Sequence, residues 1–334
     1  MKRPRRRLWS AALVVTLLGV MLAPTGSAHA APPDVTADGA VLWDPADDKV
    51  LFGIDEGQPL PMASITKIMT VLLALEGGAA DDTLTVSAHA AEVGREPGVA
   101  TLGLEAGEQV PVADVLAGLV LQSGNDGAVA VAEHVAGSEE AFTRLMNARA
   151  AELGLDATSF LNASGLTDDP DNYASPRDLA RLAEEAMTHE RFAAWADAEV
   201  LTLSGIGTIA NRNELLGDYP AADGVKTGYT ALAGYCLVAS ATRHGRQLIT
   251  VVLDSQDRFG ESGALLTYGF RAFQRAEPVA ADAAVTRYRW ADATVPLTAD
   301  DVLGRTVRAN RRVRWRTALE PDAALPVAEG QILG

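Results

Sequence analysis

The sequence predicts an α/β fold in which one sheet is built from strands at both ends of the main domain. Residues 39–43 and 49–54 are apolar runs separated by the turn segment Asp-Pro-Ala-Asp-Asp, which indicates a β-hairpin. Residues 234–242 and 246–254 are β-rich runs joined by Arg-His-Gly, which indicates a second hairpin. Helical patterns occupy the interval between the two hairpins. Strands on both sides of a helical region favour a single sheet that carries helices on its faces.

The expected helices are marked by apolar periodicity and by capping residues. Ser138 is expected to cap one helix, because two glutamates follow it in the first turn. Ser175 followed by Pro176 is expected to start another, with serine as the N-cap and proline at the first helical position. Residues 80–111 are expected to be irregular, and residues 31–38 to form a loose leader. The expected helices cover residues 62–76, 112–122, 127–137, 138–154, 175–195 and 262–274.

The first thirty residues differ from the rest of the chain. They combine five Lys and Arg residues, an apolar stretch and the small-residue site Ala28-His29-Ala30, which is the layout of a cleaved secretory signal peptide. We therefore expect residues 1–30 to be removed between Ala30 and Ala31, and the mature protein to work outside the cytoplasm. An uncleaved membrane anchor is the alternative, although the apolar stretch is short for a membrane span.

The composition changes again near residue 277. Short β-leaning pieces separated by turns then follow, which indicates a main domain over residues 31–276 and a small β-rich domain over residues 277–334. A domain of that size has a marginal core, so we expect it to lean on the main domain. It ends within what look like its last strands. Either the protein is released into the wall space, or the sequence is truncated.

Charge and composition exclude several classes of partner. The formal net charge is −16, so the protein is not expected to bind nucleic acid or anionic lipid, which are also negatively charged. No segment after the predicted signal peptide is apolar enough to span a bilayer, so at most peripheral membrane contact is expected. The single cysteine, Cys236, cannot form an intrachain disulfide and is expected to be a small buried hydrophobe. The sequence contains neither a His-Glu-x-x-His motif nor a Cys/His cluster, so we expect no metal or other cofactor.

Ser64 and Lys67 are the first candidates for chemistry. The chain has 24 arginines but only four lysines, so a lysine within an apolar helix is unexpected. Residues three apart on a helix share a face, which lets the hydroxyl and the amine touch. A buried lysine can lose its proton, whereas an arginine effectively cannot, and a neutral amine can activate a serine nucleophile. A surface lysine on a helix is the plainer explanation of this pair alone.

Two further segments strengthen the hypothesis. Residues 123–125 (Ser-Gly-Asn) interrupt two apolar helices, where a capping turn would be the plain explanation. Residues 226–228 (Lys-Thr-Gly) begin a strand, and Gly228 allows a ligand to approach the backbone closely. Ser-x-x-Lys, Ser-x-Asn and Lys-Thr-Gly in this order form the set found in penicillin-binding proteins and class A β-lactamases.

The chain resembles the low-molecular-mass penicillin-binding proteins, which are serine-type D-alanyl-D-alanine carboxypeptidases of the peptidase S11 family. The matching text includes PMASITKIMT, GLVLQSGNDGAVAVAEHVAG, FLNASGL with NYASPRDLARLA, and DGVKTGYTALAGYCLVASATRHGRQLITVVL, and it covers about residues 38 to 274. The resemblance implies a β-lactamase/transpeptidase-like fold, with an antiparallel sheet flanked by helices and a helical subdomain. The implied substrates are peptidoglycan stem peptides that end in D-Ala-D-Ala, and β-lactams are the implied covalent inhibitors.

The resemblance also implies the role of each catalytic residue. Ser64 is the implied nucleophile that forms the acyl-enzyme, and Lys67 is the base that activates it. Ser123 would relay a proton to the leaving D-alanine amine. Asn125 would hold either the amide of the substrate or Lys67.

The remaining site residues are implied to bind the substrate. Lys226 and Thr227 would grip the terminal carboxylate beside Gly228, and Arg258 would assist them. The backbone N–H groups of Ser64 and Tyr229 would form the oxyanion hole.

Three alternative functions are weighed against this one. A class A β-lactamase hydrolyses its acyl-enzyme with a glutamate in Glu-x-x-Leu-Asn; this chain has Leu161 and Asn162 but places Thr158 at the glutamate position, which predicts slow release of penicillin. Endopeptidase or transpeptidase action on cross-linked peptides would use the same serine. A catalytically inactive penicillin-binding wall protein is disfavoured because all the motif side chains are present.

Overall fold

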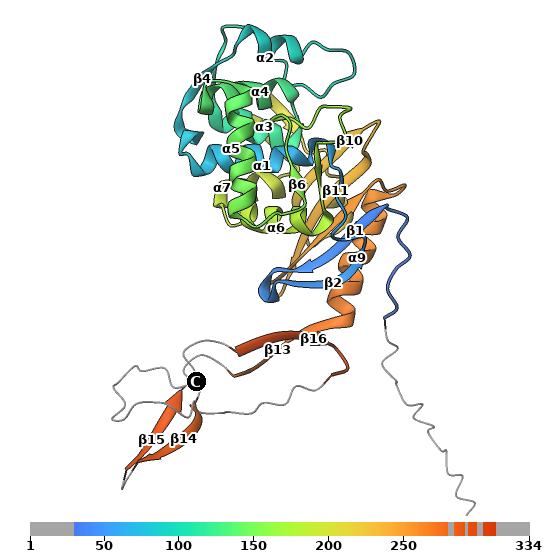
Figure 1. Cartoon of the computed structure of the whole chain (residues 1–334), viewed down its shortest axis with the longest axis vertical. Coiled ribbons are helices and arrows are strands. Elements are labelled where there is room, and N and C mark those ends of the chain that lie inside the picture. Colours follow the sequence, from blue (N-terminus) through green and yellow to red (C-terminus); the bar gives the residue numbers. More distant parts are fainter. Residues whose placement is uncertain (1–29, 280–283, 291–292, 299–302, 312–334) are drawn as a thin grey trace, which may run out of the picture.

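The computed structural model describes residues 30–279, 284–290, 293–298 and 303–311, and Figure 1 shows their arrangement. A helical region lies on one side of the main sheet, and the long helix α9 (Arg258–Ala272) lies on the other. The predicted signal peptide lies outside the described residues apart from Ala30, so its cleavage stays a prediction. The final segment, residues 312–334, also lies outside them.

The main sheet confirms the predicted pairing of the two ends of the domain. Its order is β10-β11-β12-β1-β2, and every neighbouring pair is antiparallel. The first strand pairs with a strand more than 200 residues later, with Gly39 opposite Leu253. The five strands are β1 (Gly39–Asp44), β2 (Lys49–Ile54), β10 (Ala222–Thr230), β11 (Gly234–Arg243) and β12 (Arg246–Leu253).

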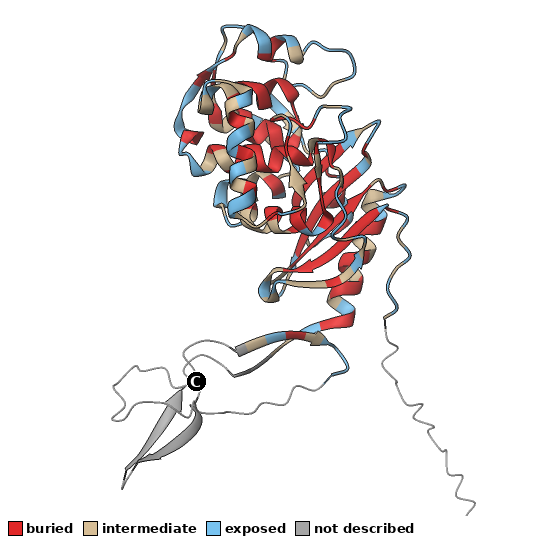
Figure 2. Ribbon diagram, in the orientation of Figure 1, coloured by how far each residue is buried: buried red, intermediate tan, exposed pale blue. Residues whose placement is uncertain are grey.

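Alternate residues of the strands serve two separate cores, as the two-residue period of a strand requires. Leu42 of β1 packs in the core that includes Leu265 of α9. Its neighbours Val41 and Trp43 belong to the larger core beneath the helical region, which also contains Ile68 of α1. Figure 2 shows buried residues along the sheet and the central helices. Both faces of the sheet are therefore covered.

The helical region is built around α1, most of whose residues are buried. The N-cap predictions are confirmed: Ala141 N donates to Ser138 Oγ (3.2 Å), and Asp178 N donates to Ser175 Oγ (3.1 Å). The helices are α1 (Lys67–Glu76), α2 (Ala88–Val93), α3 (Val112–Leu121), α4 (Asn125–Ala136), α5 (Glu139–Glu152), α6 (Pro176–Met187), α7 (Glu190–Asp197) and α8 (Leu215–Asp218), with 3₁₀ turns η1 (Pro45–Asp47), η2 (Ala63–Thr66) and η3 (Ala79–Asp81).

Short strand pairs complete the main domain. A small sheet has the order β3-β7-β6, and two further pairs are β4-β5 and β8-β9. These strands are β3 (Leu60–Pro61), β4 (Thr83–Thr85), β5 (Gln109–Pro111), β6 (Thr158–Ser159), β7 (Tyr173–Ala174), β8 (Val200–Leu203) and β9 (Gly207–Ala210).

Two predicted helices differ from the structure at a turn. The helix expected at residues 62–76 starts as η2, so Ser64 lies on a 3₁₀ turn and α1 proper begins at Lys67. The helix expected at residues 175–195 is two helices. There the Thr188 hydroxyl donates to the Glu185 carbonyl (2.7 Å), and His189 is extended, so the chain turns before α7 begins.

Two segments expected to be irregular or loose are more ordered than the sequence predicts. Residues 80–111 contain β4, α2 and β5, and the Ser87 hydroxyl caps α2 by accepting from Ala90 N (2.9 Å). In the leader, Thr36 Oγ1 donates to the buried carboxylate of Glu261 (2.7 Å), and Ala37 is buried. Glu261 lies far from Thr36 in the sequence, and β4 pairs with β5 across the intervening segment, with Thr83 opposite Pro111. Local sequence pattern specifies neither contact.

The predicted β-rich segment near the C-terminus contains two strand pairs. β13 (Phe273–Val279) pairs with β16 (Leu303–Arg308), and β14 (Ala284–Trp290) pairs with β15 (Ala293–Thr298). β13 follows α9 directly and spans the predicted boundary at residue 277.

The β13-β16 pair contacts the main domain through polar groups. Thr306 of β16 donates from its hydroxyl to Asp44 Oδ2 (2.7 Å), and Lys49 Nζ donates to the Thr306 carbonyl (3.1 Å). Arg246 of β12 donates to the same Asp44 oxygen (2.7 Å). The β13-β16 pair therefore contacts the main domain, and the division into two domains at residue 277 stays a prediction.

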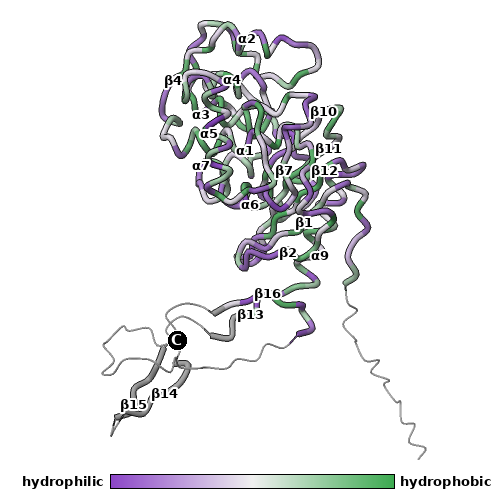
Figure 3. Tube along the Cα trace, viewed as in Figure 1, coloured by the Kyte–Doolittle hydropathy of each residue, from purple (hydrophilic) through white to green (hydrophobic). Residues whose placement is uncertain are grey.

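Hydropathy along the described chain shows no membrane-crossing helix. Figure 3 shows hydrophobic stretches interrupted repeatedly by hydrophilic ones. Among the described residues, every helix is too short or too polar to cross a bilayer.

We predict that Asp44 is a main determinant of stability at this contact. Its side chain is fully buried and binds Arg246, whose side chain is only 12% exposed. Replacing Asp44 with Ala leaves that guanidinium without its carboxylate and should lower the free energy of unfolding by about 3 kcal/mol. Equilibrium urea unfolding measures this change.

Asp81→Ala is the matched control, because Asp81 also pairs with an arginine (Arg191, 2.6 Å) but is 81% exposed. An exposed pair contributes less than about 1 kcal/mol. Equal losses of stability in the two variants would contradict the prediction.

Candidate active site

A cavity of about 160 Å³ lies where η2, the α3–α4 junction and β10 meet. β10 is the edge strand of the main sheet, so one side of it faces this cavity instead of another strand. Seven of the nine residues predicted from the sequence line it: Ser64, Ser123, Asn125, Thr227, Gly228, Tyr229 and Arg258. The two lysines, Lys67 and Lys226, are not on its wall and are buried.

Lys67 lies within hydrogen-bonding distance of the predicted nucleophile. Its Nζ atom is 3.0 Å from Ser64 Oγ, 2.7 Å from Asn125 Oδ1 and 2.6 Å from the carbonyl oxygen of Ser164. A neutral amine has two N–H groups and one lone pair. The amide and carbonyl oxygens accept the two N–H groups, so the lone pair is left for the Ser64 hydroxyl proton.

The surroundings of Lys67 favour its neutral form. None of its three hydrogen-bonding partners is a carboxylate. Burial lowers the pKa of Lys67 well below its usual value, and the positive charge of Lys226 lowers it further. The carboxylate of Asp126 opposes this and Arg212 reinforces it. The amine is therefore suited to accept a proton from a hydroxyl.

Ser123 and Asn125 come from the junction between α3 and α4. Ser123 has a positive φ of 66°, which is strained for a residue with a side chain. Its Oγ is buried and has no hydrogen-bond partner among the described residues, although Ser123 lines the cavity. A buried hydroxyl without a partner is uncommon in proteins and marks Ser123 as a residue whose role has to be explained. Asn125 starts α4, and its backbone N–H is held by the Ala100 carbonyl (2.8 Å).

The Lys-Thr-Gly segment lies on β10, and the structure gives Gly228 a role that the sequence did not suggest. A Cβ at this position would lie 3.1 Å from the Met62 carbonyl oxygen and 3.3 Å from the Ile65 backbone nitrogen. Gly228 therefore lets β10 approach the turn that carries Ser64. The sequence suggested close approach by a ligand, and Gly228 does line the cavity, but its immediate neighbour is the protein backbone.

Lys226 is almost completely buried, and its Nζ donates to the Thr227 carbonyl (3.0 Å). Burial, together with the positive charges of Arg212 and Arg258, lowers the pKa of Lys226 to about 7. The ammonium of Lys226 therefore lies behind the cavity wall, and it loses its proton near neutral pH.

Two arginines on the cavity wall supply further positive charge. Arg258, at the start of α9, donates to the Gly228 carbonyl (3.0 Å) and lies over the ring of Tyr235. Arg212 is exposed and was not predicted from the sequence. The side chains of Asn211 and Asn213 fix its backbone, for example through Asn213 Nδ2 to the Gly224 carbonyl (2.9 Å). The Asn-Arg-Asn pattern is the only local signal for it.

Asp126 holds the opposite wall of the cavity in place. Its buried carboxylate accepts from the backbone N–H groups of Leu102 (2.9 Å), Gly103 (2.9 Å) and Leu104 (3.1 Å), and from the Thr101 hydroxyl (2.7 Å). Residues 98–100, which precede this anchored segment, line the cavity. Sequence reasoning missed this residue because its partners are backbone groups of a distant loop.

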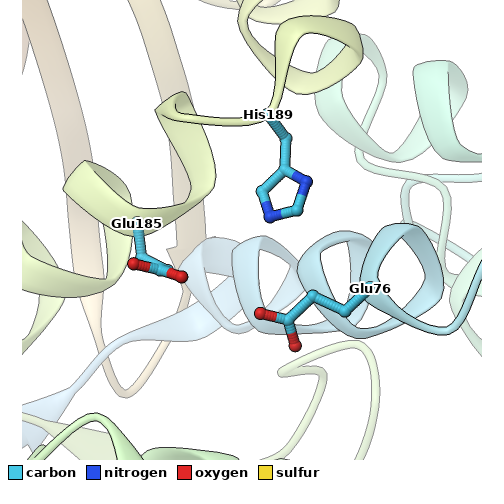
Figure 4. A group of neighbouring side chains, drawn as sticks. All are labelled: Glu76, Glu185 and His189. Atoms are coloured by element: carbon cyan, nitrogen blue, oxygen red, sulfur yellow. The ribbon is translucent and has the colours of Figure 1, made fainter.

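One cluster in the described part of the chain could hold a metal ion by geometry. Glu76, Glu185 and His189 place ligand atoms within 4.8 Å of one another (Figure 4). Arg149, however, donates to both carboxylates, at 2.6 Å to Glu76 and 3.3 Å to Glu185. A guanidinium already pairs with both carboxylates, so we interpret the cluster as an ion-pair network around Arg149.

Comparisons with known proteins agree with this geometry. Residues 26–257 match the family model Peptidase_S11, D-alanyl-D-alanine carboxypeptidase. The chain is 38% identical over 322 residues to D-alanyl-D-alanine carboxypeptidase DacC of Escherichia coli, covering 90% of this chain and 80% of that protein. It is 38% identical over 250 residues to DacF of Bacillus subtilis, covering 71% of this chain and 63% of DacF.

Solved structures show the same fold. Penicillin-binding protein 5 from Haemophilus influenzae matches with a TM-score of 0.78 and 33% identity, over 91% of this chain and 92% of that one. The Streptomyces K15 DD-transpeptidase matches with a TM-score of 0.68 and 30% identity, over 72% of this chain and 99% of that one. The fold is therefore the predicted β-lactamase/transpeptidase-like one. Because the family model spans most of the chain and the motif residues meet in one cavity, this chain belongs to the peptidase S11 family of D-alanyl-D-alanine carboxypeptidases.

Proposed function

We propose that the protein removes the terminal D-alanine from peptidoglycan stem pentapeptides through an acyl-enzyme on Ser64. One observation carries this proposal: the fully buried amine of Lys67 lies 3.0 Å from a serine hydroxyl that opens into a cavity. Family membership supplies the reaction class, and the site supplies a nucleophile, a base and a cationic cavity wall.

In the first half-reaction, Lys67 accepts the Ser64 hydroxyl proton while the oxygen attacks the carbonyl carbon of the penultimate D-alanine. The negative charge on the carbonyl oxygen would be met by the backbone N–H groups of Ser64 and Tyr229. The C–N bond then breaks, and the D-alanine amine leaves with a proton relayed from Lys67 through the unpartnered hydroxyl of Ser123.

In the second half-reaction, a water molecule attacks the Ser64 ester, and its proton passes to Lys67. The shortened peptide leaves with a new carboxylate, and Ser64 regains its proton. A β-lactam would follow the first half-reaction, but its amine leaving group stays attached after ring opening.

The terminal carboxylate is expected to bind at the positive side of the cavity. Thr227, Arg212 and Arg258 line it, and Lys226 lies beneath. A carboxylate near these cations gains charge-assisted hydrogen bonds. The Oδ1 atom of Asn125 accepts from Lys67 Nζ (2.7 Å), which supports its predicted role of holding Lys67 in place; Asn125 also lines the cavity, so its role of holding the substrate amide stays a prediction.

The structure also bears on the class A-like alternative. Thr158, at the position of the β-lactamase glutamate, lies on β6 and donates to Asp178 (2.9 Å). It does not line the cavity. This arrangement supports slow hydrolysis of the penicilloyl ester, as predicted from the sequence.

Similarity to the Streptomyces K15 DD-transpeptidase supports a second candidate, transpeptidation. The acyl-enzyme would be the same, with an amine of a second stem peptide as the acceptor in place of water. Action on cross-linked peptides as an endopeptidase would likewise change only the leaving group. We further propose that the protein works on the extracytoplasmic side, consistent with its predicted signal peptide.

The proposed function is tested with a pentapeptide that ends in D-Ala-D-Ala. We expect stoichiometric release of free D-alanine, and none from the same peptide ending in L-alanine. Penicillin labelling without any D-alanine release would reject both the carboxypeptidase and the transpeptidase, because each releases D-alanine when the acyl-enzyme forms. Turnover that depends on an added acceptor amine would favour the transpeptidase.

We predict that Lys67→Arg abolishes acylation although arginine is also a basic residue. A guanidinium stays protonated and cannot act as the base, so the acylation rate should fall by about 10²- to 10⁴-fold. Stopped-flow labelling with fluorescent penicillin measures it. Lys49→Arg is the matched control, since Lys49 lies on β2 and binds a backbone carbonyl of β16; it should label normally. Normal labelling of Lys67→Arg would refute the role of Lys67 as base.

The pH profile of kcat/KM should have an acidic limb caused by Lys67 and an alkaline limb caused by Lys226. Acylation needs neutral Lys67, so the rate should rise with pH through the lowered pKa of Lys67. Carboxylate binding needs charged Lys226, so kcat/KM for a free-acid peptide should fall above its pKa of about 7.

Lys226→Arg keeps the cation at every pH and should remove the alkaline limb. A C-terminally amidated substrate should lack this limb even with the wild-type protein. An alkaline limb that survives in both cases would show that another group causes it.

A further inference from the structure

The segment Asn162-Ala163-Ser164-Gly165 has no part in the proposed function so far, yet it contacts the catalytic base. The Ser164 carbonyl accepts a hydrogen bond from Lys67 Nζ at 2.6 Å, the shortest of the three contacts of that amine. Ser164 itself is buried. What fixes this carbonyl therefore also fixes the orientation of the base.

The side chain of Asn162 builds the turn that presents the carbonyl. Its Oδ1 atom accepts from the backbone N–H groups of Gly165 (2.6 Å) and Ser164 (3.1 Å), and from the Ser164 hydroxyl (3.3 Å). Its Nδ2 donates to the Leu166 carbonyl (3.1 Å). The half-buried side chain of Asn162 thus binds polar groups of Ser164, Gly165 and Leu166, in the manner of an Asx turn.

The turn is also fitted tightly against the segment that carries Ser64. Gly165 has a φ of 74°, and a Cβ there would lie 2.0 Å from the Ala63 carbonyl oxygen, so no side chain can be placed at this position. On the other side, α1 holds two successive carbonyls. Thr70 Oγ1 donates to the Ala163 carbonyl (2.6 Å), and Lys67, one helical turn earlier, donates to that of Ser164.

From these contacts we propose that Asn162 is a positioning residue for Lys67. By shaping the turn, Asn162 aims the Ser164 carbonyl at one N–H of the amine. Asn125 Oδ1 takes the other N–H, and the lone pair is left directed at the Ser64 hydroxyl. This inference rests on the proposed role of Lys67 as base. It adds a residue that touches neither the substrate nor the amine.

A purely structural role is the competing explanation, and a second asparagine separates the two. Asn147 of α5 holds the start of the same loop, accepting from Phe160 N (3.0 Å) and donating to the Phe160 carbonyl (2.8 Å). In the described part of the chain, the hydrogen bonds of the Asn147 side chain go only to Thr143 and Phe160, neither of which binds Lys67. Asn147→Ala therefore measures the cost of loosening the loop without disturbing the Ser164 carbonyl.

The experiment compares acylation of the full chain by a chromogenic or fluorescent β-lactam in stopped flow. Asn162→Ala should lower the first-order acylation rate by about 10- to 100-fold, with the dissociation constant of the initial non-covalent complex unchanged. Asn147→Ala should acylate at the wild-type rate. The proposal is overturned if Asn162→Ala acylates at the wild-type rate, or if its acylation rate falls no further than that of Asn147→Ala.

Asn162→Asp gives a second readout that loop stability cannot mimic. Its carboxylate still accepts from the same N–H and O–H donors, so most of the acylation rate should return. The added negative charge near Lys67 favours the ammonium form, so the acidic limb of the acylation rate should move to higher pH. If Asn162→Ala does not fold, Asn162→Asp alone tests the proposal. An acylation rate of Asn162→Asp as low as that of an unfolded control, or an acidic limb at the wild-type pH, counts against the proposal.

The β-lactam also separates this inference from the proposed function. Ring opening requires Ser64 and Lys67 but no release of D-alanine. A wild-type protein that forms no adduct would overturn both. A wild-type protein that forms the adduct while Asn162→Ala matches it would overturn the role of Asn162 alone.

Discussion

The burial of Lys67 is the constraint on which the site depends. A buried ammonium without a carboxylate partner is costly, so the amine lowers its pKa and loses its proton instead. Nearby Asp126 could have supplied a counter-charge. Its oxygens, however, are occupied by backbone N–H groups of residues 102–104 and by a hydroxyl. The Asp126 carboxylate therefore holds the cavity wall and does not hydrogen-bond to the amine, although its charge still opposes the lowering of the Lys67 pKa.

The fold delivers this arrangement because three distant segments close on one edge of the sheet. β10 is an edge strand, which leaves one side of it available to the turn that bears Ser64. Gly228 permits the approach on one side of that turn, and Gly165 permits it on another. Two positions without side chains therefore let backbone meet backbone around the nucleophile, where packed side chains would have forced the segments apart.

Sequence reasoning succeeded where the signal was local or where strand patterns were strong. The spacing of Ser64 and Lys67 specified their contact, and the two hairpins specified the sheet. It failed where long-range contacts decide the outcome. Arg212 resembles any of the 24 arginines until Asn211 and Asn213 are seen to fix its backbone. The Ser164 carbonyl carries no sequence signal, because every residue has one.

The scarcity of lysine links composition to chemistry. Among the described residues, arginines make the ion pairs on the surface and at the Asp44 contact, where a permanent charge and a forked geometry are useful. Lys67 and Lys226 are buried, and the pKa of each is lowered. A guanidinium buried in the same places would keep its charge and its full desolvation cost. A chain that favours arginine this strongly retains lysine at position 67, where the proton has to leave, and at position 226, where burial makes a permanent charge costly.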